Sequence, residues 1–124
     1  MSGQDYGGLI TVRLSTGTTL SLRGTLNINP ARMSAEAQTN DDGSVDRIGT
    51  NRPATAEINF ADRGIDYDAL MRSSRFNVTF IETFSGVTHY FTEAFMAGDP
   101  QLNRKTGEVT GLTINAEKYS KVKN

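Results

Sequence analysis

The sequence contains no cysteine and no tryptophan, only one histidine, and no long apolar run. The absence of cysteine excludes a disulfide framework and any site built on a thiolate. No apolar stretch approaches the ~20 residues that a membrane-spanning helix needs, so the sequence predicts none. Residues 1–8 also lack the basic and apolar parts of a signal peptide, and we therefore expect the chain to stay in the cytoplasm of the producing cell.

An excess of charge of one sign is missing too, because 13 basic and 14 acidic residues leave a formal net charge of −1. No overall field therefore favours nucleic acid or a membrane as a partner. The hydrophobic share of 36% is below the usual ~45–50%, a norm that also counts glycine. The length of 124 residues is typical of one domain, for which we expect a thin core and much polar β surface.

The strongest pattern runs from Arg75 to Met96, where two alternating segments flank Ser85-Gly86. Alternation on both sides of a glycine-containing turn predicts a β-hairpin, and a two-residue loop would pair Phe84 with Val87. The apolar face is then expected to hold Phe76, Val78, Phe80, Phe84, Val87, Phe91 and Phe95, with Glu82 among them. The opposite face carries Thr79, Thr83, Thr88 and Thr92, and it is suited to water, a lumen or a neighbouring subunit.

Alternation predicts further strands near 10–15, 20–29, 54–60 and 109–116. Leu14 is expected opposite Leu20, and Gly24 is expected to mark a bulge. One short helix is predicted at about 66–73, capped by Asp66. The fold class is therefore mainly β, a β-sandwich or barrel of about six to seven antiparallel strands. We expect a single domain over 1–124 with flexible ends at 1–8 and 118–124.

The segment 31–52 has few apolar residues and no helical stripe. A structureless loop of ~20 residues is unusual in a compact domain and is usually functional or disordered. A turn pattern at Asn40-Asp41-Asp42-Gly43 predicts a projecting, two-armed loop with its tip near Asp42-Gly43. Plain disorder is the alternative.

Few residues support catalysis or metal binding. His89 is expected opposite Glu82, an arrangement that can orient an imidazole but is more often structural. No serine is linked by a motif to His89 and an acid. The EF-hand pattern is absent both from Asp62, Asp66 and Asp68 and from the acids of 40–46. The scattered Arg104, Lys105, Lys118, Lys121 and Lys123 favour a solvated face over nucleic-acid binding, so we predict no catalytic, cofactor or metal site.

Three segments match a known pattern when they are taken together: LSLRGTLNINP at 20–30, AEINFADRGIDYDAL at 56–70 and GVTHYF at 86–91. With Gly98-Asp99-Pro100 and KTGEVTGL at 105–112, they resemble the tail tube proteins of contractile-tailed, Mu-like bacteriophages. The resemblance covers most of the chain, from Leu9 to about Tyr119.

The resemblance implies a β-sandwich or barrel with one helix, assembled as a homo-hexamer into rings. The rings would stack into a hollow tube inside a contractile sheath, and DNA would pass through the lumen without sequence-specific binding. Tail sheath, baseplate hub and tape measure proteins are the implied partners, with no membrane and no cofactor. The implied location is the virion tail, with the host cytoplasm during assembly, and the implied role is structural rather than enzymatic.

In such an assembly the segment 31–52 would join one ring to the next, or one subunit to its neighbour within a ring. Its expected contact residues are the apolar Met33, Val45 and Ile48 and the polar Glu36, Asp41, Asp42, Asp46 and Arg47. Two alternatives stay open. One is the tube of a phage-derived contractile particle that carries no genome, and the other is a monomeric β-sandwich module that uses this loop for a ligand.

Overall fold

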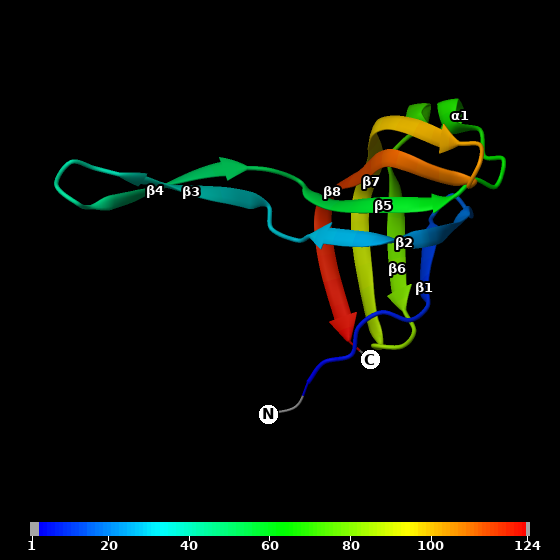
Figure 1. The fold of residues 1–124 in the computed structure, drawn as a ribbon, viewed down its shortest axis with the longest axis horizontal. Coiled ribbons are helices and arrows are strands. Elements are labelled where there is room, and N and C mark those ends of the chain that lie inside the picture. The colour runs from blue at the N-terminus through cyan, green and yellow to red at the C-terminus, as the bar shows by residue number, and fades with distance from the viewer. Residues whose placement is uncertain (1–2, 124) are drawn as a thin grey trace.

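A six-stranded barrel with a projecting two-stranded ribbon makes up the computed structural model, which describes residues 3–123 (Figure 1). Every neighbouring pair in the closed order β1-β2-β5-β8-β7-β6 is antiparallel. The barrel strands are β1 (Ile10–Leu14), β2 (Thr19–Asn29), β5 (Ala54–Ala61), β6 (Phe76–Glu82), β7 (Val87–Asn103) and β8 (Glu108–Lys123). The ribbon is β3 (Met33–Thr39) and β4 (Val45–Asn51), and α1 (Tyr67–Arg72) is the helix of the described residues. The predicted mainly β fold with one short helix is confirmed.

The barrel encloses a core of its own. Phe60, Phe80 and Phe91 are fully buried, and the rings of Phe80 and Phe91 meet edge to face with centroids 5.5 Å apart. Aliphatic side chains from every barrel strand complete the cluster. Full burial of one such side chain is worth ~1.5–3 kcal/mol, so the barrel has a source of stability that does not depend on the ribbon.

The central hairpin forms between β6 and β7, but the predicted two-residue loop is wrong. Glu82 pairs with Val87 and Phe80 with His89, which leaves a four-residue loop over 83–86. The Gly86 amide donates to the Glu82 carbonyl at 2.9 Å and closes this loop. The error shifts the register by two residues, and a shift of two preserves the faces because the side-chain period is also two. Phe84 falls in the loop, where it is 62% exposed instead of buried.

Phe95 is a second correction to the predicted apolar face. The register of β6 against β7 changes between Phe76 and Val78, and Glu93 opposite this point has a φ of 56°. The extra residue of this β-bulge reverses the alternation, so that Ala94 is buried and Phe95 is exposed. The guanidinium of Arg75 lies 4.9 Å from the centroid of the Phe95 ring.

The first hairpin, β1–β2, differs from its predicted register in the same way. Val12 pairs with Leu20, whereas Leu14 was expected there. The loop has the expected three residues but begins one position earlier, since the Leu14 amide donates to the Thr18 carbonyl at 2.9 Å. The bulge predicted at Gly24 is confirmed by the register shift between Leu22 and Leu26.

The two longest strands, β7 and β8, continue past a bulge where Gly98 and Gly111 face each other. Both glycines have positive φ, 99° and 85°. A Cβ on Gly98 would lie only 2.2 Å from the Gly111 carbonyl oxygen, so the two backbones approach too closely for any side chain. Gly98-Asp99-Pro100 therefore forms a bulge within one strand.

The helix α1 covers one end of the barrel (Figure 1). The Asp66 carboxylate accepts a hydrogen bond from the Ala69 amide at 3.1 Å, which confirms the predicted cap. Tyr67, Leu70 and Met71 share one face and pack against the barrel core. Amphipathic spacing and capping in the sequence thus predicted the helix correctly.

The ends of the chain differ from each other. The expected flexible tail at 118–124 is wrong for 118–123, because these residues continue β8, with Tyr119 opposite Phe91 and Lys121 opposite His89. Asn124 lies outside the described residues. At the other end, residues 3–9 are exposed and without regular structure, and the flexibility predicted for 1–8 stays a prediction, with Met1 and Ser2 outside the described residues.

Candidate assembly surfaces

The ribbon β3–β4 projects well away from the barrel (Figure 1). Its pairing runs without a break from Met33 opposite Asn51 to Thr39 opposite Val45. All seven residues of each strand are exposed. The predicted projecting, two-armed shape with a tip near Asp42-Gly43 is confirmed, but the segment is a regular β-ribbon and neither a structureless loop nor disordered.

Polar side chains fix the tip of the ribbon. The Asn40 amide donates to the Ser44 carbonyl at 2.8 Å, and Asp42 Oδ1 accepts from the Ser44 hydroxyl at 2.6 Å and from its amide at 3.0 Å. These hydrogen bonds to the charged form lower the pKa of Asp42, the Ser44 hydroxyl most. Asn40 Nδ2 also donates to Asp46 Oδ2 at 3.1 Å. Local hydrogen bonds thus replace the missing apolar alternation as the source of order at the tip.

The eight predicted contact residues lie on different faces of the ribbon. The register places Met33, Val45 and Arg47 on one face and Glu36, Asp46 and Ile48 on the other, while Asp41 and Asp42 form the tip. The three apolar anchors therefore do not form one patch. They remain exposed, at 50% for Met33, 62% for Val45 and 43% for Ile48.

The threonines of β6 and β7 lie on the outer side of the barrel but do not form the predicted ladder. Thr79 pairs with Tyr90 and Thr88 with Ile81, while Thr83 falls in the loop. Thr92 faces Lys118 of β8. We use the name outer face for Thr79, Ile81, Thr88, Tyr90, Thr92, Lys118, Ser120 and Val122. It mixes polar and apolar side chains, and its cations are Lys118 and, opposite Thr79 on β1, the exposed Arg13.

Two stretches of barrel backbone have a strand partner on one edge only. From Leu22 to Asn29, β2 pairs with β5 and, among residues 3–123, with nothing on its other edge. From Glu117 onward, β8 pairs with β7 alone within the described chain. Such edges expose unpaired N–H and C=O groups that can accept another strand. The sequence could not reveal them, because they depend on where the neighbouring strands end.

A polar network lies inside the barrel at the end that carries the 83–86 loop. His89 Nε2 contacts Glu82 Oε2, and His89 Nδ1 lies 2.7 Å from the Tyr119 hydroxyl oxygen. Burial, followed by the Glu82 charge, raises the pKa of Tyr119. The expected Glu82–His89 contact is confirmed, although the register behind it was wrong. Both ring nitrogens are occupied, and the nearby Ser85 hydroxyl donates to Glu82 at 3.1 Å rather than to the imidazole, which is not the geometry of a nucleophilic serine.

A cavity of about 570 Å³ opens beside this network. Its apolar wall comes from Leu22, Leu26 and Ile28 of β2, and its polar end from Glu82 and His89. The N-terminal segment from Tyr6 to Ile10 forms its rim. The cavity lies along the unpaired edge of β2.

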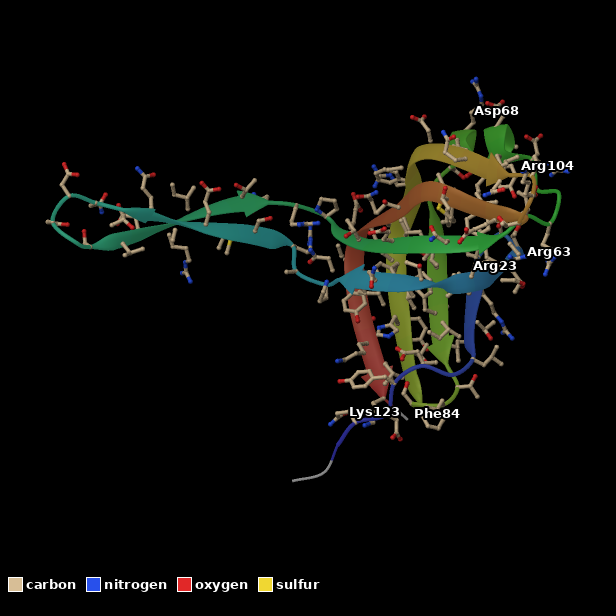
Figure 2. All side chains as sticks on the ribbon, viewed as in Figure 1. Arg23, Arg63, Asp68, Phe84, Arg104 and Lys123 are labelled. Atoms are coloured by element: carbon tan, nitrogen blue, oxygen red, sulfur yellow. The ribbon has the colours of Figure 1, made fainter. Side chains whose placement is uncertain are left out.

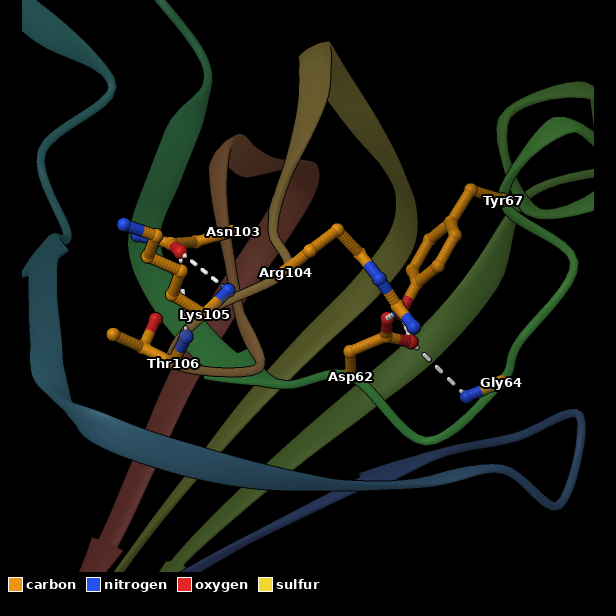
Figure 3. A network of polar contacts seen from close by, with 7 residues as sticks. All are labelled: Asp62, Gly64, Tyr67, Asn103, Arg104, Lys105 and Thr106. Carbon is orange, nitrogen blue, oxygen red and sulfur yellow. Dashed lines mark hydrogen bonds and ion pairs between the residues drawn. The ribbon is translucent and has the colours of Figure 1, made fainter.

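Asp62 connects the turn before α1 to the turn between β7 and β8 (Figure 3). Its carboxylate accepts from the Gly64 amide at 3.0 Å, the Tyr67 hydroxyl at 2.9 Å and Arg104 Nη1 at 2.9 Å. The Gly64 amide, then Tyr67 and Arg104, lower the pKa of Asp62. Burial, then the hydrogen bond and charge of Asp62, raise the pKa of Tyr67 to about 12.

The acids near α1 therefore have structural partners instead of forming a cation site. Asp66 caps the helix, and Asp68 forms an ion pair with Arg72 at 3.0 Å. Within residues 3–123, no three or more His, Asp or Glu side chains gather in a way that could hold a metal ion. The same part of the chain contains no helix that is long and apolar enough to cross a membrane.

The chain matches a known protein family along almost its whole length. A model of the phage tail tube protein family matches residues 3–121. The chain belongs to this family. It is thus a structural subunit of a tube, as the sequence resemblance implied.

Three solved structures illustrate what this tail tube family member resembles in fold. Hcp1 from Flavobacterium johnsoniae has a TM-score of 0.64 at 16% identity, covering 94% of this chain and 97% of its own. The sheath–tube complex of the PVC extracellular contractile injection system, in its extended state, has a TM-score of 0.57 at 9% identity, covering 93% and 88%. The cap of the anti-feeding prophage has a TM-score of 0.54 at 11% identity, covering 100% and 96%. At these identities the similarity shows the fold. No curated protein matches the sequence.

For a tail tube subunit, the surfaces described above are the candidate functional sites. The turn pattern and the polar composition of 31–52 predicted that this segment projects. Sequence reasoning missed the unpaired edges of β2 and β8. The basic residues that were expected to be scattered are indeed divided, with Arg104 and Lys105 on the β7–β8 turn and Lys118, Lys121 and Lys123 along the last part of β8.

Proposed function

We propose that six copies of this chain form a ring, that the rings stack into a hollow tube inside a contractile sheath, and that DNA passes through the lumen during ejection. Family membership supports a tube subunit, and the PVC structure supports a sheath around the tube. Baseplate hub and tape measure proteins are the further partners proposed. The particle would be a virion tail that is assembled in the host cytoplasm.

The observation that carries the proposal is the ribbon. An isolated two-stranded hairpin is at best marginally stable in water. This one has no residue buried against the barrel in either strand, yet it is regular along its whole length. A partner surface on another subunit would cover its faces and offset the ~1–2 kcal/mol per residue of backbone entropy that ordering costs.

The unpaired edges of β2 and β8 support a closed ring. An open edge promotes indefinite strand addition, and closed symmetry limits it because each edge meets a defined partner. The cavity along β2 offers apolar surface for a neighbouring chain. We propose these two edges as the contacts between subunits within a ring, with the ribbon acting between subunits or between rings.

The outer face is the proposed lumen wall. Thr79, Thr88 and Thr92 belong to it, with Thr79 and Thr92 half-buried and Thr88 buried among its neighbours, whereas Thr83 lies in the adjacent loop. Passing DNA must slide, so the wall should contain few cations that could hold phosphates. Lys118 and Arg13, which lies opposite Thr79 on β1, are the cations of this wall, and two cations per subunit are few enough to favour this assignment. A tube structure with a lumen dominated by arginine and lysine would contradict the electrostatic claim, and one with these threonines elsewhere would contradict only the assignment.

Electron microscopy of the purified protein tests the proposal. Negative-stain images at high concentration, with and without a preformed baseplate, are expected to contain rings or hollow rods. Light scattering on the same samples measures the size of the species in solution. Monomers alone, even with the baseplate present, would support a monomeric β-barrel binding module instead.

A tube of a genome-free contractile particle is the second candidate, favoured by the similarity to injection-system structures. The two candidates differ in what passes through the lumen. Particles purified from the producing cell and treated with nuclease are expected to contain protected DNA. Particles with assembled tails but without protected DNA would favour the genome-free alternative.

A further inference from the structure

Two surfaces of opposite charge lie at opposite ends of the subunit. The ribbon, residues 33–51, holds Glu36, Asp41, Asp42 and Asp46 against Arg47 alone, a net charge of −3. At the far end of the long axis, Figure 2 shows Arg23, Arg63 and Arg104 together. Lys105 is next to Arg104 on the β7–β8 turn (Figure 3). We use the name basic end for Arg23, Arg63, Arg104 and Lys105.

The basic end is a built surface, because three separate segments are joined there. Arg23 Nη1 donates to the Thr106 carbonyl at 3.1 Å and so links β2 to the β7–β8 turn. Arg104 reaches Asp62 at 2.9 Å, and Asp62 holds the turn that contains Arg63. These contacts hold Arg23 and Arg104 in place and fix the backbone turns from which Arg63 and Lys105 project.

Several acids lie close to the basic end, but most already have partners. Asp62 is paired with Arg104, and Asp68 with Arg72. Asp66 caps α1, and Glu108 is half-buried at the start of β8. The side chains of Arg63 and Lys105, in contrast, form no ion pair or hydrogen bond with any residue of 3–123. Their charges remain available to a partner.

The acids of the ribbon also fall into two groups, those with hydrogen-bond partners in the ribbon and those without. Asp42 accepts two hydrogen bonds from Ser44, and Asp46 accepts one from Asn40, so both help to hold the tip. Glu36 and Asp41 have no side-chain partner within the described residues. They are therefore the negative charges of the ribbon that a second molecule can use.

We propose that the acidic ribbon of one subunit docks on the basic end of another copy of this chain. The inference rests on the proposed tube and names the surface that receives the ribbon. A seven-residue strand extends ~23 Å, and the ribbon points away from its own basic end, so the contact is between molecules. Contacts of this head-to-tail kind repeat from copy to copy and produce a ring or a stack.

Charge also determines which surface of one copy meets which surface of the next. Ribbon against ribbon and basic end against basic end place like charges together, whereas ribbon against basic end is complementary. A nucleic acid is the other class of partner that a basic surface fits. The ribbon is the better match because it supplies the opposite charge on every subunit, in a chain whose charges nearly balance.

Charge reversal tests the contact at positions that hold no internal structure. One variant combines Glu36→Lys with Asp41→Lys, and the other combines Arg63→Glu with Lys105→Glu. Circular dichroism checks that each variant folds. Each variant alone is expected to raise the protein concentration needed for tubes at least about tenfold, since repulsion replaces attraction at every copy of the contact.

The decisive sample is an equal mixture of the two variants. The reversed ribbon of the first variant fits the reversed end of the second, and the unreversed ribbon of the second fits the unreversed end of the first. The mixture is therefore expected to form tubes at a concentration where neither variant does. Wild-type assembly should also weaken as salt rises, because exposed charges are screened.

Three results would overturn the inference. In the first, both variants assemble like the wild type, and in the second the mixture fails although both variants fold. In the third, the Arg63→Glu/Lys105→Glu variant still forms tubes but loses binding to a short fluorescent DNA duplex, which would assign the basic end to nucleic acid. All three leave the proposed function intact, whereas the absence of wild-type tubes under every condition would contradict the proposed function itself.

Discussion

At the residue scale, the lack of side chains at Gly98 and Gly111 lets the backbones of β7 and β8 approach closely, so that both strands continue past their bulge. Gly98→Ala adds a Cβ 2.2 Å from the Gly111 carbonyl oxygen and also forces alanine to a φ of 99°. The left-handed backbone and the overpacking together predict a loss of ~2–4 kcal/mol in the free energy of unfolding. Chemical denaturation measures this loss.

Gly24→Ala is the matched control for that change. Gly24 has a φ of 85° but no atom within 4 Å of an added Cβ, so only the backbone term applies. We expect a loss of ~1–2 kcal/mol. Equal losses in the two variants would show that the close approach at Gly111 contributes nothing.

His89 provides a second prediction at this scale. His89→Gln is expected to cost little in folding or assembly at neutral pH, because an amide can still donate to Glu82 and accept from the Tyr119 hydroxyl. His89→Leu removes both contacts and leaves Glu82 Oε2 without its partner, although Ser85 still donates to Oε1, and we expect a loss of ~1–3 kcal/mol in the free energy of unfolding. Thermal melts and electron microscopy compare the two. Loss of folding in the glutamine variant would mean that the imidazole has a more specific role.

Asp62 predicts a pH dependence. Its pKa in the folded state is lowered by the Gly64 amide, Tyr67 and Arg104, so its stabilising contribution is fully present above the unfolded pKa of about 3.8. That contribution is lost as the pH falls through the lower, folded pKa. Asp62→Asn should therefore be less stable than the wild type at neutral pH, with a difference that shrinks on acidification. Asp68→Asn, which removes only an exposed ion pair, is the control, and the same shrinking difference there would refute the assignment.

At the element scale, the alternation and capping patterns of the sequence predicted the six barrel strands and α1. They missed both hairpin registers, because alternation indicates which residues share a face but not where the turn begins. They also missed the exposure of Phe95, since the bulge at Glu93 uses a non-glycine residue with positive φ that no turn pattern marks. Faces survived these errors only where the shift was an even number of residues.

The projection of 31–52 was predicted, but the regular strands of the ribbon were missed for a different physical reason. Its strands have no face toward the core of their own chain, so the alternation that marks other strands is absent. Only the tip, where Asn40 and Asp42 make local hydrogen bonds, left a recognisable pattern. The extension of β8 over 118–123 was missed because its lysine-rich sequence has the composition of a tail.

Deleting the ribbon tests the independence of the two elements. We expect a variant with residues 33–51 replaced by a short Gly-Ser link to keep its β circular dichroism, with a change in unfolding free energy within ~1 kcal/mol. The same variant should form no tubes, because the docking element is gone. Tubes of normal length would refute the role of the ribbon, and loss of the fold would mean that the ribbon belongs to the core.

At the scale of the whole molecule, the barrel encloses its own core, whereas we propose that the ribbon, the unpaired edges and the basic end contact other copies of the chain. The sequence indicated the family and the ribbon, which is one side of the proposed docking contact. It could not indicate the other side, because Arg23, Arg63 and Arg104 are far apart along the chain and are brought together by the barrel, where Asp62 and the Thr106 carbonyl hold two of them. Assembly surfaces of this kind depend on tertiary structure.

A cryo-electron microscopy reconstruction of the assembled protein at side-chain resolution would show the docking contact itself. We expect a hollow tube of stacked sixfold rings in which Glu36 and Asp41 of each subunit lie beside Arg63 and Lys105 of another. A tube in which the ribbon of every subunit contacts no other subunit, or points into solvent, would contradict it.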